Sequence, residues 1–159
     1  VTAALDVLLI LGIILAVVMI DRFGRIKLQC TGFLGMSAGL LILAASGWFS
    51  GHVHLALVFF GFGLFNVMVN MGPNPTTYLL PAEIFPTRLR ATGHGFASAS
   101  GKVGAAVGIF LLPIFKIELG LTATLISLAA ICLIGYIITQ TLGYETKGKS
   151  LEDLEVAKK

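Results

Sequence analysis

The sequence predicts an all-α fold, a polytopic bundle of membrane-spanning helices. The 159 residues are 57% hydrophobic and only 12% charged, whereas an average soluble domain is about 25% charged. Residues 28–82 and 119–144 contain no Asp, Glu, Lys or Arg. A helix needs about 20 apolar residues to cross a bilayer, so the first run predicts two spans and the second predicts one. This pattern excludes a soluble enzyme, a nucleic-acid-binding module and a disordered linker.

Five apolar segments follow one another, and each is predicted to be a helix because lipid offers the backbone no hydrogen-bond partner. They cover residues 1–20, 28–49, 55–80, 92–115 and 120–142. Residues 1–143 therefore form the transmembrane part, and residues 144–159 form a polar tail. The first segment has no anchoring residues at its start, so we expect at least one further helix before Val1.

The distribution of Lys and Arg predicts the orientation, because cytoplasmic loops carry an excess of these residues. With five spans, the first and third connections and the tail share one side, and they hold nine of the eleven basic residues. These nine are Arg22, Arg25, Lys27, Arg88, Arg90, Lys147, Lys149, Lys158 and Lys159. The sequence thus predicts a multi-pass protein with a cytoplasmic C-terminus.

Two of the segments carry a pair of glycines four residues apart. Gly35 and Gly39 lie in the second segment, and Gly104 and Gly108 lie in the fourth. Such spacings let helix backbones approach closely, so both pairs are predicted to pack against neighbouring helices. The alternative is a surface along which helices slide or rock.

The third segment is interrupted late in its course by Gly72, Pro73 and Pro75. Prolines remove backbone hydrogen bonds, and transporters commonly place binding sites at broken membrane helices. Asn74, Thr77 and Tyr78 share one helical face here and are predicted to offer neutral donors to a solute. The alternative is a simple kink that improves packing.

Lys102 lies deep in the fourth segment, roughly 15 Å from Thr92 at helical rise. A Lys near the middle of the bilayer costs about 2.5–3.5 kcal/mol on insertion scales. Its helical face is small and weakly polar, as a cavity wall would be. We interpret Lys102 as a cation that receives an anionic substrate; the alternative is a structural ion pair with a carboxylate of another helix.

Charged residues in three polar stretches are predicted to meet at one membrane face. Individual surface ion pairs contribute about 0–1 kcal/mol, but together they could bias a gate; alternatively they are solvated topology markers. The candidate gate residues are Asp21, Arg22, Arg25, Glu83, Arg88, Arg90 and Glu145. His52 and His54 are interpreted as a polar outer turn rather than a metal site, and no cofactor is expected.

Three motifs, in this order, resemble the C-terminal half of a major facilitator superfamily transporter. They are Asp-Arg-x-Gly-Arg at residues 21–25, Pro-Ala-Glu-x-Phe-Pro-x-Arg-x-Arg at 81–90, and Glu-Thr-Lys-Gly-x-Ser-Leu-Glu at 145–152. Gly-Pro-Asn at 72–74, His-Gly at 94–95 and Gly-Lys at 101–102 are most similar to the phosphate:proton symporter branch. The first and last motifs are shared with sugar porters, which lack the intramembrane Lys.

The resemblance implies a fold of twelve helices in two halves, with this chain supplying the eighth to twelfth. It implies that Asn74 and Lys102 line a phosphate site, and that Asp21, Arg22, Arg25, Glu83, Arg88 and Glu145 form a cytoplasmic gate. The remaining phosphate ligands and the proton-coupling carboxylates are expected on helices before Val1, in an N-terminal half that this chain would need as its partner.

The sequence thus leads to the hypothesis of a secondary active transporter of the cell membrane, which takes up inorganic phosphate with protons by alternating access. A facilitator for a sugar or an organic anion is one alternative. A membrane subunit or remnant that does not transport by itself is the second. An intramembrane enzyme is disfavoured because the sequence lacks a paired nucleophile and base or a metal cluster.

Overall fold

The computed structural model describes residues 2–143, 145 and 146, and the side chains from residue 7 onward. This part of the chain is all-helical, as predicted. Its helices are α1 (Thr2–Phe23), α2 (Arg25–Ser46), α3 (Gly51–Met71), α4 (Pro73–Ile84), α5 (Arg90–Glu118) and α6 (Gly120–Leu142). Apart from Glu145 and Thr146, the predicted tail lies outside the described residues.

Four described stretches are long and apolar enough to cross a membrane. They are Arg25–Ser46, Gly51–Ile84, Arg90–Glu118 and Gly120–Leu142. The segment predicted over residues 1–20 forms α1, a helix of 22 residues. At 1.5 Å per residue it is about 33 Å long, the thickness of a bilayer's hydrocarbon core. The described helices therefore follow the predicted order of spans, with ends that differ from the predicted bounds by a few residues.

The third predicted segment consists of two helices, as its prolines indicated. Gly72, with φ −107° and ψ −90°, separates α3 from α4. Pro73 and Pro75 have no N–H, so the carbonyl groups of Val69 and Met71 lose their usual helical donors. The segment is also longer than predicted, because α3 starts at Gly51 and α4 continues to Ile84.

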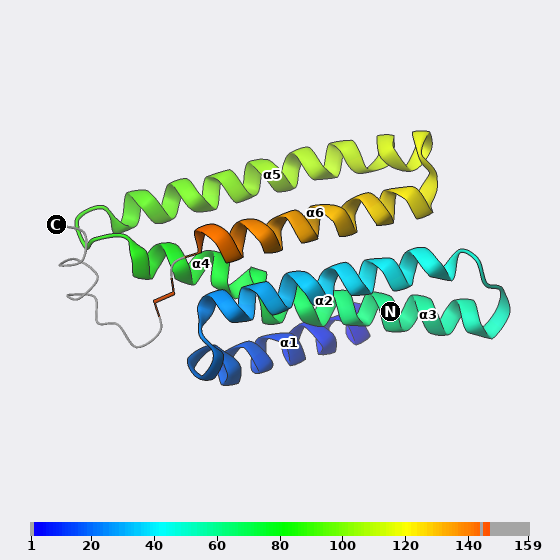
Figure 1. Ribbon diagram of the computed structural model, residues 1–159, viewed down its shortest axis with the longest axis horizontal. Coiled ribbons are helices and arrows are strands. Elements are labelled where there is room, and N and C mark those ends of the chain that lie inside the picture. The colour runs from blue at the N-terminus through cyan, green and yellow to red at the C-terminus, as the bar shows by residue number, and fades with distance from the viewer. Residues whose placement is uncertain (1, 144, 147–159) are drawn as a thin grey trace.

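The connections between helices alternate between the two ends of the bundle (Figure 1). Gly24 and residues 85–89 connect helices at one end, where α6 also finishes, while residues 47–50 and Leu119 lie at the other. Arg22, Arg25, Lys27, Arg88 and Arg90 all belong to the first of these ends. The clustering of these basic residues at one end agrees with the predicted alternation of loops.

The two histidines predicted to form a polar turn belong instead to the first turn of α3. His52 and His54 lie within Gly51–Met71. The Nδ1 atom of His54 lies 2.8 Å from the carbonyl oxygen of Ser46, the last residue of α2. The same oxygen accepts a hydrogen bond from the backbone N–H of Phe49 at 3.2 Å, so His54 adds a second contact and ties the two helices together.

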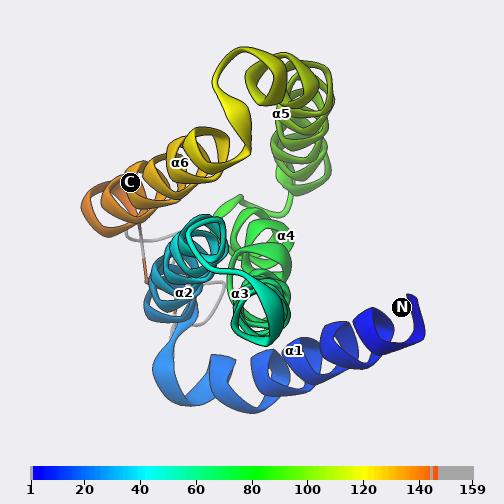
Figure 2. The same ribbon diagram turned by 90° about the vertical axis from the view of Figure 1, so that its right-hand side faces the viewer.

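The core lies between α2, α3 and α6, with α2 in the middle (Figure 2). Its centre is formed by the buried residues Leu40, Ala129 and Cys132, against which Phe33, Phe65 and other hydrophobic side chains pack. By contrast, no residue of α5 is buried in the described part of the chain. One complete helix face is therefore uncovered along α5.

The glycine pair of α2 packs closely, whereas the pair of α5 does not. A Cβ atom on Gly39 would lie 2.8 Å from the carbonyl oxygen of Gly61 in α3, so the two backbones touch. Gly104 and Gly108 have open space within 4 Å among the described residues. The predicted close packing is confirmed for the second segment, whereas no described helix packs against the glycine pair of the fourth, for which close packing stays a prediction.

Replacing Gly61 by Ala should destabilise the bundle by about 1–3 kcal/mol, the usual cost of overpacking. The new Cβ would lie 2.9 Å from the carbonyl oxygen of Gly39 and 3.0 Å from the amide nitrogen of Leu43. Backbone atoms of a packed helix cannot move aside cheaply, so α2 and α3 must separate. The measurement is the thermal denaturation midpoint of the purified protein in detergent.

Gly63→Ala in the same helix is the matched control. Its new Cβ would meet only the end of the Leu8 side chain, at 3.7 Å, so the midpoint should hardly change. Equal midpoints for Gly61→Ala and Gly63→Ala would contradict the backbone contact.

Candidate functional site

A cavity of about 280 Å³ lies between the α3–α4 break and α5. It could hold several water molecules, each of which takes about 30 Å³ in the liquid. Its lining consists of Val69, Pro73, Asn74, Thr77 and Tyr78 on one side and Ala97, Ser98, Gly101, Lys102 and Ala105 on the other. The structure thus brings together the four residues predicted to bind a solute: Asn74, Thr77, Tyr78 and Lys102.

Lys102 provides the charge of this cavity. It lies about 18 Å along α5 from Arg90, near the middle of a helix about 43 Å long. Within the described residues, its ammonium group makes no ion pair or hydrogen bond. The other lining residues are neutral, so the exposed ammonium group of Lys102 gives the lining a net positive charge. The cavity therefore favours an anion.

The start of α4 adds to this positive potential. α4 begins at Pro73, and the N-terminus of a helix carries a partial positive charge. Pro73 and Pro75 lack N–H groups, so Asn74 between them is the residue of this first stretch that has a backbone N–H. A broken helix that points its N-terminus at a midplane cavity is an arrangement used for anionic groups in transporters.

The hydroxyl group of Thr77 was predicted to donate a hydrogen bond to a solute, but in the structure it donates to the backbone. Its Oγ1 donates to the carbonyl oxygen of Pro73 at 2.6 Å, one helical turn back. The hydroxyl proton is therefore committed to the backbone, and only the oxygen remains to accept a hydrogen bond in the cavity. Tyr78 has an exposed ring, whose centroid lies 6.1 Å from that of His94 in α5.

Two further asparagines in α3, which were not predicted as site residues, precede Asn74. Asn70 and Asn66 continue the spacing of four residues that begins at Asn74, and all three are joined by hydrogen bonds. The sequence carries a signal for this row of hydrogen bonds: three asparagines follow one another at intervals of four residues in an apolar segment. Residues at this spacing are neighbours on a helix.

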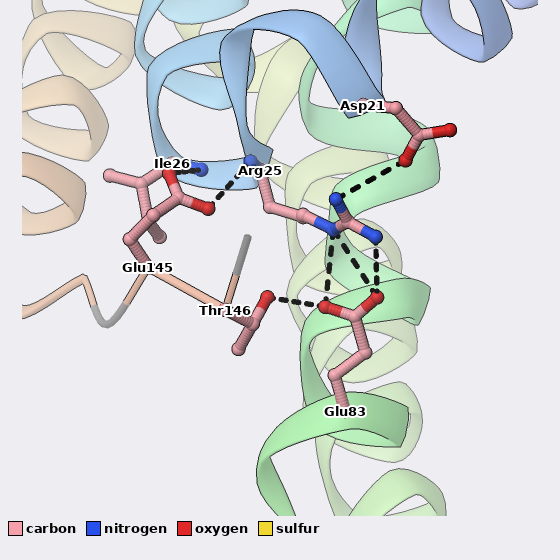
Figure 3. A network of polar contacts seen from close by, with 6 residues as sticks. All are labelled: Asp21, Arg25, Ile26, Glu83, Glu145 and Thr146. Atoms are coloured by element: carbon pink, nitrogen blue, oxygen red, sulfur yellow. Dashed lines mark hydrogen bonds and ion pairs between the residues drawn. The ribbon is translucent and has the colours of Figure 1, made fainter. Parts of the chain in front are cut away.

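A second polar group, the charge cluster, consists of Asp21, Arg25, Glu83, Glu145 and Thr146 (Figure 3). Arg25 donates to Glu83 from Nε at 3.2 Å and from Nη2 at 3.0 Å, so the pair is bidentate. Both side chains are largely buried, with 16% and 21% of their surface exposed. Nη1 of Arg25 also lies 3.4 Å from Oδ1 of Asp21, which is exposed, and Thr146 donates to Glu83. The cluster ties α1, α2, α4 and the segment after α6 together.

Glu145 caps the start of α2 from 120 residues away. Its two carboxylate oxygens accept hydrogen bonds from the backbone N–H groups of Arg25, at 2.9 Å, and Ile26, at 3.2 Å. These N–H groups have no acceptor within the helix, and a carboxylate also suits the positive helix end. Gly24 makes the approach possible, since its φ is +90° and a Cβ there would lie 2.6 Å from Oε2 of Glu145.

The structure assembles only part of the predicted gate. Asp21, Arg25, Glu83 and Glu145 belong to the charge cluster, and Thr146 is an addition that the sequence analysis did not name. Arg22 is exposed beside Asp21. Arg88 lies within the turn that starts at Pro86, and Arg90 follows that turn. In the described part of the chain neither joins the cluster. The turn leads the backbone away from Glu83 and into α5.

Comparison with known proteins gives consistent matches over nearly the whole chain. Residues 1–157 match the sequence profile described as "Sugar (and other) transporter". The "Probable inorganic phosphate transporter 1-12" of Oryza sativa subsp. japonica is 40% identical over 154 residues, which cover 87% of this chain and 28% of that protein. The "Probable inorganic phosphate transporter 1-6" of Arabidopsis thaliana is 42% identical over 146 residues, covering 90% of this chain and 28% of that protein.

Solved structures show the same fold. The inward-open xylose transporter XylE from E. coli superposes with a TM-score of 0.81 at 25% identity, covering 97% of this chain and 34% of that chain. The major facilitator superfamily proton:xylose symporter XylE, in a sugar-bound structure, gives a TM-score of 0.79 at 24% identity, covering 98% and 34%. This chain spans a little over a quarter of the length of the curated relatives that it matches.

Proposed function

Because the chain belongs to the Sugar (and other) transporter family, we propose that it forms part of a secondary active transporter that takes up inorganic phosphate. The observation that carries this proposal is the cavity in which Lys102 is the one charged lining residue. The names of the curated relatives, inorganic phosphate transporters at about 40% identity, support the same solute. Phosphate is an anion, and an ammonium group without an ion pair among the described residues attracts one.

In this proposal, Lys102 neutralises the phosphate while Asn74, Thr77 and Tyr78 offer it polar atoms. Further helices, like those in the rest of the matching transporters, form the opposite wall and carry a carboxylate that takes up a proton. The charge of the proton offsets that of the anion. Alternating access then proceeds as the two walls rock about the bound solute.

The charge cluster acts as the gate in this scheme, at the cytoplasmic end of a protein of the plasma membrane. The excess of Arg and Lys at this end supports the orientation. Asp21, Arg25, Glu83 and Glu145 hold the end together, and Arg22, Arg88 and Arg90 provide charges to the facing wall. The bound groups are solute and proton only, with no cofactor and no chemical conversion of the phosphate.

A neutral sugar is the second candidate, because the matching solved structures are xylose transporters. A cavity whose only charge is an ammonium group is poorly suited to a neutral solute, since the charge loses its hydration without gaining a counter-charge.

Uptake by the full-length transporter containing this chain, reconstituted in proteoliposomes, tests the proposal. Labelled phosphate should accumulate under an inward proton gradient, and xylose and organic anions should not compete. Collapse of the proton gradient should abolish accumulation. The 159-residue chain reconstituted alone should transport nothing, because it supplies one wall of the path. Strong competition by xylose would favour the sugar candidate, and uptake by the short chain alone would contradict the two-walled path.

A further inference from the structure

The side chains of Asn66, Asn70 and Asn74 form a hydrogen-bonded chain along α3 and the first turn of α4. Nδ2 of Asn70 donates to the carbonyl oxygen of Asn66 at 2.8 Å and lies 3.4 Å from its Oδ1. Nδ2 of Asn74 donates to Oδ1 of Asn70 at 3.1 Å. This row of hydrogen bonds crosses the break at Gly72, so it connects α3 to the cavity that Asn74 lines.

Asn70 occupies the middle of this chain and is held firmly in place. Only 5% of its surface is exposed. α1 lies directly against it, because a Cβ atom on Gly12 would be 2.8 Å from the Cβ of Asn70. A buried amide in such a position is kept only when its polar atoms are satisfied.

The orientation of each amide follows from the chemistry of its partner, which is how amide nitrogen and oxygen are distinguished. A backbone carbonyl can only accept a hydrogen bond, so the nitrogen of Asn70 must face Asn66. The oxygen of Asn70 therefore faces Asn74, and Asn74 must donate to it. One N–H of Asn74 is committed, while its oxygen Oδ1 has no hydrogen-bond donor among the described residues.

The cavity thus combines a cation with a fixed neutral acceptor. Asn74 is exposed and lines the cavity together with Lys102. An acceptor oxygen repels the bare oxygen atoms of an anion but binds an anion that carries a hydroxyl group. Near neutral pH, phosphate and arsenate carry such a proton, whereas sulfate carries none.

We propose that Asn70 is a positioning residue, which fixes the amide of Asn74 so that its Oδ1 accepts the P–OH group of phosphate and disfavours sulfate. The inference rests on the proposed phosphate transport and adds the basis of its selectivity. Sites built to pair a polar group of the substrate reject analogues without it, because the buried group of the site is left unpaired. Without Asn70, the amide of Asn74 turns freely and offers its N–H groups to any oxyanion.

Asn70→Leu in the full-length transporter tests this role, since Leu is similar in size but cannot hold the Asn74 amide. We expect the KM for phosphate to rise roughly tenfold, as for the loss of one oriented hydrogen bond. The inhibition constant of arsenate should rise by the same factor. The inhibition constant of sulfate should stay constant or fall, so that selectivity for phosphate over sulfate drops about tenfold.

Asn66→Leu is the matched control, because Asn70 donates mainly to the backbone oxygen of residue 66, which any residue keeps. Its selectivity should equal that of the unmodified protein. Asn70→Leu in an Asn74→Leu background should change selectivity no further, since Asn70 acts through Asn74. A merely structural role would lower the maximal rate for all anions without changing selectivity.

Unchanged selectivity in folded Asn70→Leu would overturn the positioning role. If that variant does not fold, Asn74→Leu alone decides, because it removes the acceptor itself and must lower selectivity. Unchanged selectivity in Asn74→Leu would overturn the acceptor role. Failure of the unmodified transporter to take up phosphate would instead reject the proposed function, and the inference with it.

Discussion

Lys102→Ala should reduce phosphate uptake by roughly 30-fold or more while the protein still reaches the membrane in normal amounts. Removing one partner of a desolvated charge pair costs about 2–5 kcal/mol, and each 1.4 kcal/mol is a factor of ten in affinity. Insertion should not suffer, because a Lys near the bilayer centre costs about 2.5–3.5 kcal/mol. Initial rates of labelled phosphate uptake, normalised to transporter in the membrane, measure the effect.

Lys116→Ala is the matched control, because it removes the same charge from the last turn of the same helix. It should leave uptake within about twofold of normal, since Lys116 does not line the cavity and exposed charges contribute little. Lys102→Met, which keeps an unbranched apolar stem, should behave like Lys102→Ala. Normal uptake by either Lys102 variant would remove this residue from the solute site.

Arg25→Gln should lower the turnover number about tenfold and leave the KM for phosphate nearly unchanged. The pair of Arg25 with Glu83 is bidentate and mostly buried, so its loss should cost about 1–2 kcal/mol, between the exposed and buried limits. The pair belongs to the charge cluster rather than to the cavity, so its loss alters the equilibrium between open and closed states. Concentration-dependent uptake separates turnover from KM.

Two comparisons make this prediction specific to the pair. Lys27→Gln removes an exposed charge at the same end, from a residue outside the charge cluster, and should leave turnover unchanged. The double variant Arg25→Gln with Glu83→Gln should transport no worse than Arg25→Gln alone, because the unpaired carboxylate is gone. A raised KM with normal turnover would show that Arg25 acts on solute binding rather than on the gate.

The spans and the cavity residues could be predicted because their signals are local. A charge-free run of sufficient length can only cross the membrane as helices. Two prolines and a glycine within four residues break a helix wherever it lies. Lys102 was conspicuous because a membrane helix tolerates a central cation only for a reason. The break then brings residues of α4 opposite Lys102, so both halves of the site were visible in sequence.

The remaining features depend on contacts between distant segments. Glu145 meets the start of α2 across 120 residues, and no spacing rule connects the two. Gly104 and Gly108 have the same spacing as Gly35 and Gly39, but the packing of α5 leaves them open. The hydroxyl of Thr77 was predicted to face a solute, yet a backbone carbonyl one turn earlier takes its proton. Spacing identifies a face, but tertiary neighbours decide what that face contacts.

The short helix α4 has a mechanical consequence. Asn74 lies in its first turn and Glu83 in its last, about 14 Å apart along the axis at 1.5 Å per residue. Gly72, with its non-helical dihedral angles, separates this helix from α3. One short helix therefore carries both a lining residue of the cavity and the carboxylate that Arg25 holds. In the proposed transporter, a tilt of α4 about Gly72 would act on the cavity and on the charge cluster together.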